Sequence, residues 1–316
     1  MILTPAIRYT LIGVLVLFLL SVPHIFGDYP KTLATEILIY GLFAMSIDIL
    51  AGFAGRTSLG HGAIFGTAGY VVAYYVATMN GDPWLAIVFG LLAAVLVSAI
   101  FGALAVRTSG VYFLLLTLAL GMVVWGVAYR WTSVTGAENG LLGVARPQVL
   151  TDLDTYYYFV LGVVAVMALI VRRFVYSPFG QAMQGIKESD SRMRTLGYNV
   201  PLVLTIGFMV SGFFAGVAGI LIVYLNNFVS PNSVALALST QGLLMAILGG
   251  VGTLWGSFIG SAVIILLQNV VSFYTERWMT ILGLLFVLTM LFAPEGLLGK
   301  GRALSRRWLK SQSSKS

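Results

Sequence analysis

The stretch GFAGRTSLGHGAIFGTAGY at residues 52–70 decides how this chain can fold. It carries six glycines among apolar residues, and it embeds Arg56, Thr57, Ser58 and His61. A uniform lipid-facing helix does not have this composition, because glycine weakens a helix and unwound backbone at membrane depth must be buried in protein or line a cavity. The stretch therefore predicts a broken or re-entrant element that lines a translocation path. Tight helix packing through small residues would explain the glycines equally well.

A second stretch, GLLMAILGGVGTLWGSFIG at residues 242–260, repeats this design with Gly249, Gly250 and Gly252 at its centre. The chain contains 36 glycines in 316 residues, which is well above the background of about 7%. The clustering predicts a second broken element and hints at an internal duplication.

The composition excludes a water-soluble globule. The chain is 59% hydrophobic and only 9% charged, so it has too little polar surface to cover soluble domains of this length. It contains no cysteine and only two histidines, which excludes a disulfide framework and a thiol nucleophile and argues against a metal centre. We expect no metal ion and no cofactor in this chain.

Apolar runs of spanning length predict an all-α polytopic membrane protein with about ten transmembrane helices, broken or re-entrant at the glycine-rich elements. Residues 1–300 would form the transmembrane domain, and residues 301–316 a polar, basic cytoplasmic tail. The expected spans are 8–26, 33–51, 58–79, 83–106, 111–131, 155–171, 201–224, 235–250, 254–273 and 279–293.

The distribution of positive charge predicts the orientation of the chain. If residues 172–200 are cytoplasmic, alternation of the spans puts only Lys31, Arg130, Arg146 and Arg277 outside, out of 18 Lys and Arg. Lysine and arginine favour the cytoplasmic side, so ten spans with both termini cytoplasmic fit the net charge of +7. A cleaved signal sequence at the first run is less consistent, because no small-residue cleavage pattern follows it.

Two acidic residues fall inside the second predicted span. Ionisable groups within a membrane are costly and suggest function, but Glu36 lies near the outer end and can reach the interface. Asp48 lies near the cytoplasmic end, where a proton or substrate role and an ion pair with Arg56 are both open. The candidate path residues are Asp48, Gly55, Ser58, Gly60, His61, Gly249, Gly250 and Gly252.

The long internal connection predicts a cytoplasmic coupling segment at 177–197. Ser177 is a helix N-cap candidate, Pro178 suits the first helical position, and the segment ends at Gly197. We expect two short helices with a bend around residues 188–191 and an apolar ridge directed away from the bilayer, ready to dock a soluble partner. A helix lying on the membrane surface is the alternative. The coupling candidates are Phe179, Met183, Ile186, Lys187, Glu188, Arg192, Met193, Leu196 and Gly197.

Several function classes can be weighed from motifs. The sequence has no G-x-x-x-x-G-K-[ST], so an ATPase is excluded and the energy for transport must come from elsewhere. An intramembrane enzyme is a weak alternative, because Ser58 and His61 would share a helical face but no third orienting acid is evident. Ion-coupled secondary transport is a stronger rival, supported by Glu36 and Asp48, but it leaves the segment at 177–197 unexplained.

The chain resembles the permease family of high-affinity branched-chain amino acid ABC importers, specifically the M-type membrane subunit, a family that also includes urea and short-amide relatives. The resemblance covers nearly the whole chain. Besides the two glycine-rich stretches it rests on SGVYFLLLTLALG (109–121), TGAENGLLGV (135–144), SPFGQAMQGIKESDSRMRTLGYNV (177–200), FVSP (228–231) and LFAPEGLLG (291–299). Asp48 departs from the pattern, since relatives more often carry asparagine there.

This resemblance implies a transport subunit of the bacterial inner membrane that is not itself an enzyme. It implies a heterodimer with a second homologous permease, a periplasmic substrate-binding protein that delivers the solute, and two ABC ATPase subunits that bind ATP and dock on the segment at 177–197. The expected solute is small and polar, a branched-chain or other amino acid, with urea or a short amide as the alternative. No nucleic acid is expected as a partner, and the positive charge is accounted for by membrane orientation.

Overall fold

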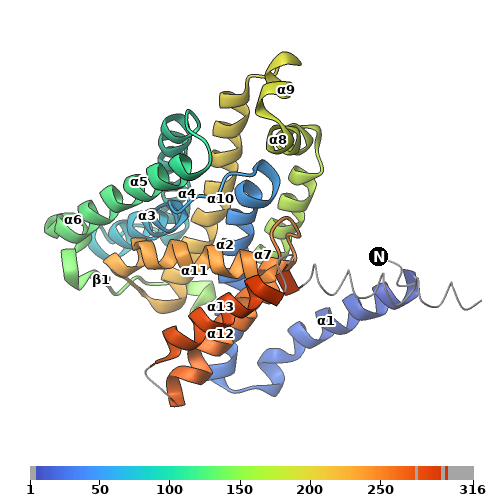
Figure 1. The fold of residues 1–316 in the computed structure, drawn as a ribbon. Coiled ribbons are helices and arrows are strands. Elements are labelled where there is room, and N and C mark those ends of the chain that lie inside the picture. Colours follow the sequence, from blue (N-terminus) through green and yellow to red (C-terminus); the bar gives the residue numbers. More distant parts are fainter. Residues whose placement is uncertain (1–4, 275–276, 293–295, 298–316) are drawn as a thin grey trace, which may run out of the picture.

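The computed structural model describes residues 5–274, 277–292 and 296–297, and it is built almost entirely of helices (Figure 1). Each predicted span corresponds to one helix. The tail predicted at 301–316 lies outside the described residues. The ten helices are α1 (Pro5–Ile25), α2 (Asp28–Asp48), α3 (His61–Ala73), α4 (Pro83–Ala105), α5 (Val111–Arg130), α7 (Leu153–Val175), α10 (Val200–Asn226), α11 (Leu236–Gly249), α12 (Gly256–Tyr274) and α13 (Trp278–Phe292).

Shorter elements connect these helices. Wider π-helical turns extend α2 over Ile49–Ala54 and α3 over Tyr74–Thr78. Strands β1 (Leu141–Leu142) and β2 (Phe228–Val229) pair antiparallel. The remaining helices are α6 (Thr132–Thr135), α8 (Pro178–Glu188), α9 (Asp190–Thr195) and the 3₁₀ turns Ala137–Asn139, Gln148–Leu150 and Pro231–Val234.

Five of the described helices are long and apolar enough to cross a membrane. They are Asp28–Ala54, Pro83–Ala105, Val111–Arg130, Leu153–Val175 and Val200–Asn226. Helices α11 and α12 are apolar but shorter. In Figure 1, α11 runs across the direction of α2, α7 and α10 rather than along it.

Helices α2 and α10 form the centre of the bundle. In the most apolar 18-residue stretch of each of these helices, 78% of the residues are buried, against 22% in α5. Glycines on α10 permit this packing: a Cβ atom at Gly216 would lie 2.5 Å from the Cβ of Ala94 on α4, and one at Gly219 would meet the carbonyl of Phe65 on α3. Close approach without a hydrophobic driving force is how helices associate in a membrane, so these small residues set the position of α3 and α4.

Contacts between connections define two ends of the bundle. At one end, Arg56 pairs with Asp190 and donates to the carbonyl of Thr108, so three connections predicted on one side meet. At the other end, Lys31 pairs with Asp154 at 2.6 Å, and β1 pairs with β2. We call these the α8 end and the β1 end. Helices α8 and α9 lie together at the top of Figure 1.

Candidate functional site

The first glycine-rich stretch is a break between two helices. Helix α2 and the π-helical turns Ile49–Ala54 that continue it end at Gly55. The φ of Gly55 is +67°, the left-handed conformation that favours glycine. Residues 56–60 are not helical, and α3 begins at His61. We call residues 55–60 the first break. The chain is broken here as predicted, but α3 begins only at His61, and glycines within α3 such as Gly66 pack closely against neighbouring residues, as the alternative of tight packing predicts.

Ser58 and His61 do not share a helical face, which corrects that expectation. Ser58 lies in the break, and its hydroxyl accepts a hydrogen bond from the backbone nitrogen of Gly60 at 3.1 Å. His61 Nε2 lies 2.7 Å from the hydroxyl of Ser211, which itself donates to the carbonyl of Ser46 at 2.6 Å. Because the serine proton is used there, Nε2 of His61 must be the donor. Neither residue activates the other, so Ser58 and His61 do not form a nucleophile and its base.

Asp48 binds backbone rather than a cation. Its fully buried carboxylate accepts hydrogen bonds from the backbone nitrogens of Gly252 at 2.6 Å and Leu254 at 3.1 Å. The alternative of an ion pair with Arg56 is wrong, because Arg56 pairs with Asp190 at 2.7 Å instead. Glu36, the other acid of this span, is partly exposed. Asp48 therefore fixes the second glycine-rich stretch against α2.

The second stretch is also a break between two helices. Helix α11 ends at Gly249, and α12 begins at Gly256. Between them, the φ values are +115° at Gly250 and +80° at Gly252. We call residues 250–255 the second break. This break contacts the π-helical turns Ile49–Ala54 directly, since a Cβ atom at Gly52 would lie 2.5 Å from the nitrogen of Gly252.

The structure brings together only some of the predicted path residues. Asp48 and Gly252 meet where the end of α2 contacts the second break. Gly60 lies elsewhere, where an added Cβ would be 2.9 Å from the ring of Phe101 on α4, and His61 contacts α10. Asp48, Ser58 and His61 are all fully buried within this chain. Whether they line a path stays a prediction.

The segment at 177–197 forms the two short helices predicted. The side chain of Ser177 caps α8 by accepting from the nitrogen of Gly180, and the bend falls at Ser189, between α8 and α9. The expected apolar ridge directed away from the bilayer is wrong. Met183, Ile186 and Met193 are 1%, 3% and 8% exposed, because α8 packs its apolar face on α10 and on Ile49–Ala54.

The outer surface of α8 and α9 is mostly polar. Glu188 and Arg192 are exposed, as is Leu196. Apolar side chains bury against the nearest apolar surface, and α10 offers one where Met183 lies over Gly207. An added Cβ at Gly207 would lie 3.0 Å from the terminal methyl of Met183.

Two polar contacts tie this helical pair to the first break. The Arg56 guanidinium, whose side chain is 9% exposed, pairs with Asp190. The ammonium of Lys187 donates to the carbonyl of Gly52 at 2.7 Å. A displacement of α8 or α9 therefore acts on the backbone on both sides of Gly55.

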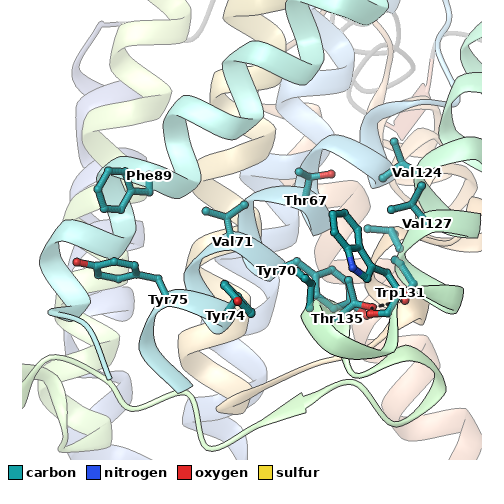
Figure 2. A pocket seen from close by; sticks show the side chains of 13 residues that line it. Thr67, Tyr70, Val71, Tyr74, Tyr75, Phe89, Val124, Val127, Trp131 and Thr135 are labelled. Atoms are coloured by element: carbon teal, nitrogen blue, oxygen red, sulfur yellow. Dashed lines mark hydrogen bonds between the residues drawn. The ribbon is translucent and has the colours of Figure 1, made fainter. Parts of the chain in front are cut away.

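A cavity of about 300 Å³ lies at the other end of α3 (Figure 2). We call it the aromatic cavity, because its walls include five aromatic side chains, Tyr70, Tyr74, Tyr75, Phe89 and Trp131, together with Val124 and Val127 of α5. A neighbouring cavity shares Val127 and Trp131 and is also lined by Arg130. Within the described residues, no group of three or more His, Cys, Asp or Glu side chains could hold a metal ion.

Sequence reasoning missed several polar residues at the breaks. Ser211 orients His61, the hydroxyl of Ser239 accepts from the nitrogen of Gly62 at 2.8 Å, and the hydroxyl of Thr117 accepts from the nitrogen of Leu59 at 3.1 Å. Each is a small polar residue inside an apolar run, which is the available signal. Ser239 and Thr117 satisfy backbone nitrogens that the broken helix leaves without partners.

Long apolar helices, two internal breaks and a capped helical pair outside the bundle describe a multi-pass membrane protein. The chain belongs to the branched-chain amino acid transport system permease component family, whose model matches residues 29–293. It is accordingly a transporter permease and not an enzyme.

The relatives are distant but cover most of the chain. The high-affinity branched-chain amino acid transport system permease protein LivM of Escherichia coli (strain K12) is 25% identical over 293 residues, covering 84% of this chain and 69% of that protein. LivH of the same strain is 23% identical over 282 residues, covering 83% and 91%. Among solved structures, PsaBC from Streptococcus pneumoniae in complex with Fab matches with a TM-score of 0.44 at 20% identity, covering 89% and 97%.

Proposed function

We propose that this chain is the membrane-spanning permease subunit of an ABC importer that translocates branched-chain or other small amino acids. Membership of the permease family supports the transport role, and the names of LivM and LivH support the solute. Urea or a short amide is the second candidate solute. Ion-coupled transport has less support, because both oxygens of Asp48 already accept backbone hydrogen bonds.

The partners follow from the same proposal. A periplasmic binding protein would deliver the solute, and two ATPase subunits would bind ATP. A second, homologous permease would complete the membrane unit, which is supported by the similarity of this chain to both LivM and LivH. The extensive exposed apolar surface of α4 and α5 offers room for lipid and for that second permease.

The observation that carries this proposal is the helical pair α8 and α9, which stands at one end of the bundle and is tied to the first break (Figure 1). In this proposal the exposed residues Glu188, Arg192, Leu196 and Gly197 face the ATPases, with Phe179 and Lys187 beside them. Met183, Ile186 and Met193 hold the pair to the bundle. ATP-driven motion of α8 and α9 would then reach Gly55 through Arg56 and Lys187.

The two breaks are proposed to border the translocation path. Asp48, Gly55, Ser58, Gly60, His61, Gly249, Gly250 and Gly252 keep this assignment as a proposal. The contact between Gly52 and Gly252 supports it, since backbone that lacks regular helical bonding can rearrange at lower cost than the helices around it.

Transport by the reconstituted importer tests the function. The chain would be co-purified with the permease, ATPases and binding protein encoded beside it and placed in proteoliposomes. We expect ATP-dependent uptake of labelled L-leucine and none of labelled urea. Uptake of urea alone would favour the second solute, while leucine uptake driven by an ion gradient without ATP would reject the ABC mechanism.

The proposed topology has ten spans, with both termini and the α8 end in the cytoplasm. It makes residues 1–300 the permease domain and 301–316 a cytoplasmic tail. Contacts within each end support the alternation, and the Lys and Arg distribution supports the direction.

Single cysteines in this cysteine-free chain test the topology. We expect Asp152→Cys, at the β1 end, to react with an impermeant thiol reagent on intact cells, because Asp152 is exposed there. Ser313→Cys should react only after the cells are opened. The reverse pattern would invert the protein in the membrane, and labelling of both on intact cells would require an even number of spans between the two positions instead of five.

The ion pair between Arg56 and Asp190 provides a test of coupling. Arg56→Asp should lower the solute carried per ATP by about tenfold, because a hydrogen bond to a charged group contributes about 1.5–3 kcal/mol and partial exposure of Asp190 brings the value to the lower end. The measurement is transport against ATP hydrolysis in one preparation.

The matched control is the exchanged pair, Arg56→Asp with Asp190→Arg, which should recover part of the coupling. Arg194→Asp, an equal charge change at an exposed site on α9, should have a smaller effect. Equal coupling in all three variants would mean that the ion pair transmits nothing.

A further inference from the structure

The aromatic cavity has walls suited to a small aliphatic group. Tyr70 and Tyr74 line it from α3 and the turn that follows, and Val124 and Val127 close it from α5 (Figure 2). Its volume of about 300 Å³ is at the lower end for small-ligand pockets. No charged residue is among those that line it, so a charged group would lose its hydration there without compensation.

The wall contains a buried hydroxyl that has no partner. Tyr70 is 7% exposed, and its hydroxyl makes no hydrogen bond to any residue that the structure describes. The hydroxyls of Thr67 and Thr135 differ, since they donate to the carbonyls of Ala63 at 2.6 Å and Ala128 at 2.7 Å. A buried polar group without a partner is rare and costly, so the hydroxyl of Tyr70 is an independent indication of a ligand.

The cavity lies at the β1 end, away from α8 and α9. Trp131, Thr135 and Val234, from the connections at that end, complete its wall. Arg130 stands at the border, because the neighbouring cavity that it lines shares Trp131 and Val127. A cation therefore lies next to an apolar chamber, on the side that faces outward in the proposed topology.

We propose that the aromatic cavity binds the branched aliphatic side chain of an incoming amino acid, with its carboxylate at the border of the cavity, where Arg130 and the Tyr70 hydroxyl can contact it. This site rests on the proposed import function and adds the place at which the solute binds. Branched-chain amino acids differ from other solutes in their apolar side chain, which is stabilised by burial against these walls. Urea is polar at almost every atom and gains nothing from them.

Photolabelling of the complete reconstituted importer tests the site. The probe is a leucine analogue with a diazirine in its side chain, and the labelled peptides are identified by mass spectrometry. We expect label within residues 67–75 or 124–131, displaced by excess L-leucine and not by urea. Tyr70→Phe, which keeps the ring, should lower labelling about fivefold through loss of one hydrogen bond.

A cavity-filling variant provides a second measurement. Val127→Phe should lower labelling and leucine uptake by about tenfold or more, because the ring occupies the volume that the side chain needs. Val127 is 47% exposed, so the chain can accept this change and still fold. Leu115→Phe is the matched control, since Leu115 lies on the same helix, is 52% exposed and lines neither cavity.

Each outcome decides between the two proposals. Three results would overturn the cavity site. The first is label at other residues, and the second is label that leucine does not displace, as a lipid-filled cavity would give. The third is equal uptake in Val127→Phe and Leu115→Phe. If the importer carries leucine and the cavity stays unlabelled, the site alone fails. If the cavity is labelled and displaced by leucine but no leucine is carried, the site stands and the proposed function fails.

Discussion

Ile186→Asp should abolish accumulation of folded protein, because it places a carboxylate at a position that is 3% exposed. The apolar face of α8 lies on α10 and on the π-helical turns Ile49–Ala54, and a charge in that interface has no partner. The expected cost is about 4 kcal/mol or more, which is enough to unfold a marginally stable protein. Fluorescence-detected size-exclusion chromatography of the full chain in detergent measures the loss.

The same change at an exposed position separates folding from docking. Leu196 is 66% exposed just after α9, so Leu196→Asp should leave the amount of folded chain unchanged. It should weaken co-purification with the ATPases, because Leu196 belongs to the proposed docking surface. If Ile186→Asp accumulates normally and loses only the ATPases, then α8 does present its apolar face outward and its observed packing is wrong.

The sequence predicted some features of α8 and missed what covers its apolar face. Ser177, Pro178 and Gly197 predicted where the segment begins and ends, since capping chemistry is local. Periodicity predicted which residues share a face, but it carries no information on what covers that face. The available signal that this face is covered by the protein was Asp190, a charged residue that interrupts the apolar face. Its partner Arg56 could not be identified from the sequence, because it lies 134 residues away.

The bundle and the breaks were predictable to different degrees. The apolar runs predicted ten helices at nearly the observed positions, because length and hydropathy are properties of each run by itself. Glycine clusters predicted both breaks. The partner of Asp48 was not predictable, since its carboxylate binds the backbone of Gly252 and Leu254, and a backbone nitrogen has no residue-specific signal.

Gly249→Ala should reduce the amount of assembled permease. A Cβ atom at Gly249 would meet the carbonyl group of Gly256, where the end of α11 lies against the start of α12. Backbone cannot rotate away as a side chain can, so the helices must separate, at a cost of about 3 kcal/mol for an overpacked contact. Alanine recovers about 1 kcal/mol through its better helix propensity, leaving a net loss of about 2 kcal/mol.

The identical substitution on α7 isolates the steric effect. No heavy atom lies within 4 Å of a Cβ added at Gly162, so Gly162→Ala should be neutral or stabilise the chain by about 0.5–1 kcal/mol. Thermal unfolding of both variants, with transport per assembled complex, makes the comparison. If Gly249→Ala assembles normally and loses turnover, the contact between Gly249 and Gly256 must open during transport, and Gly249 belongs to the moving part of the path.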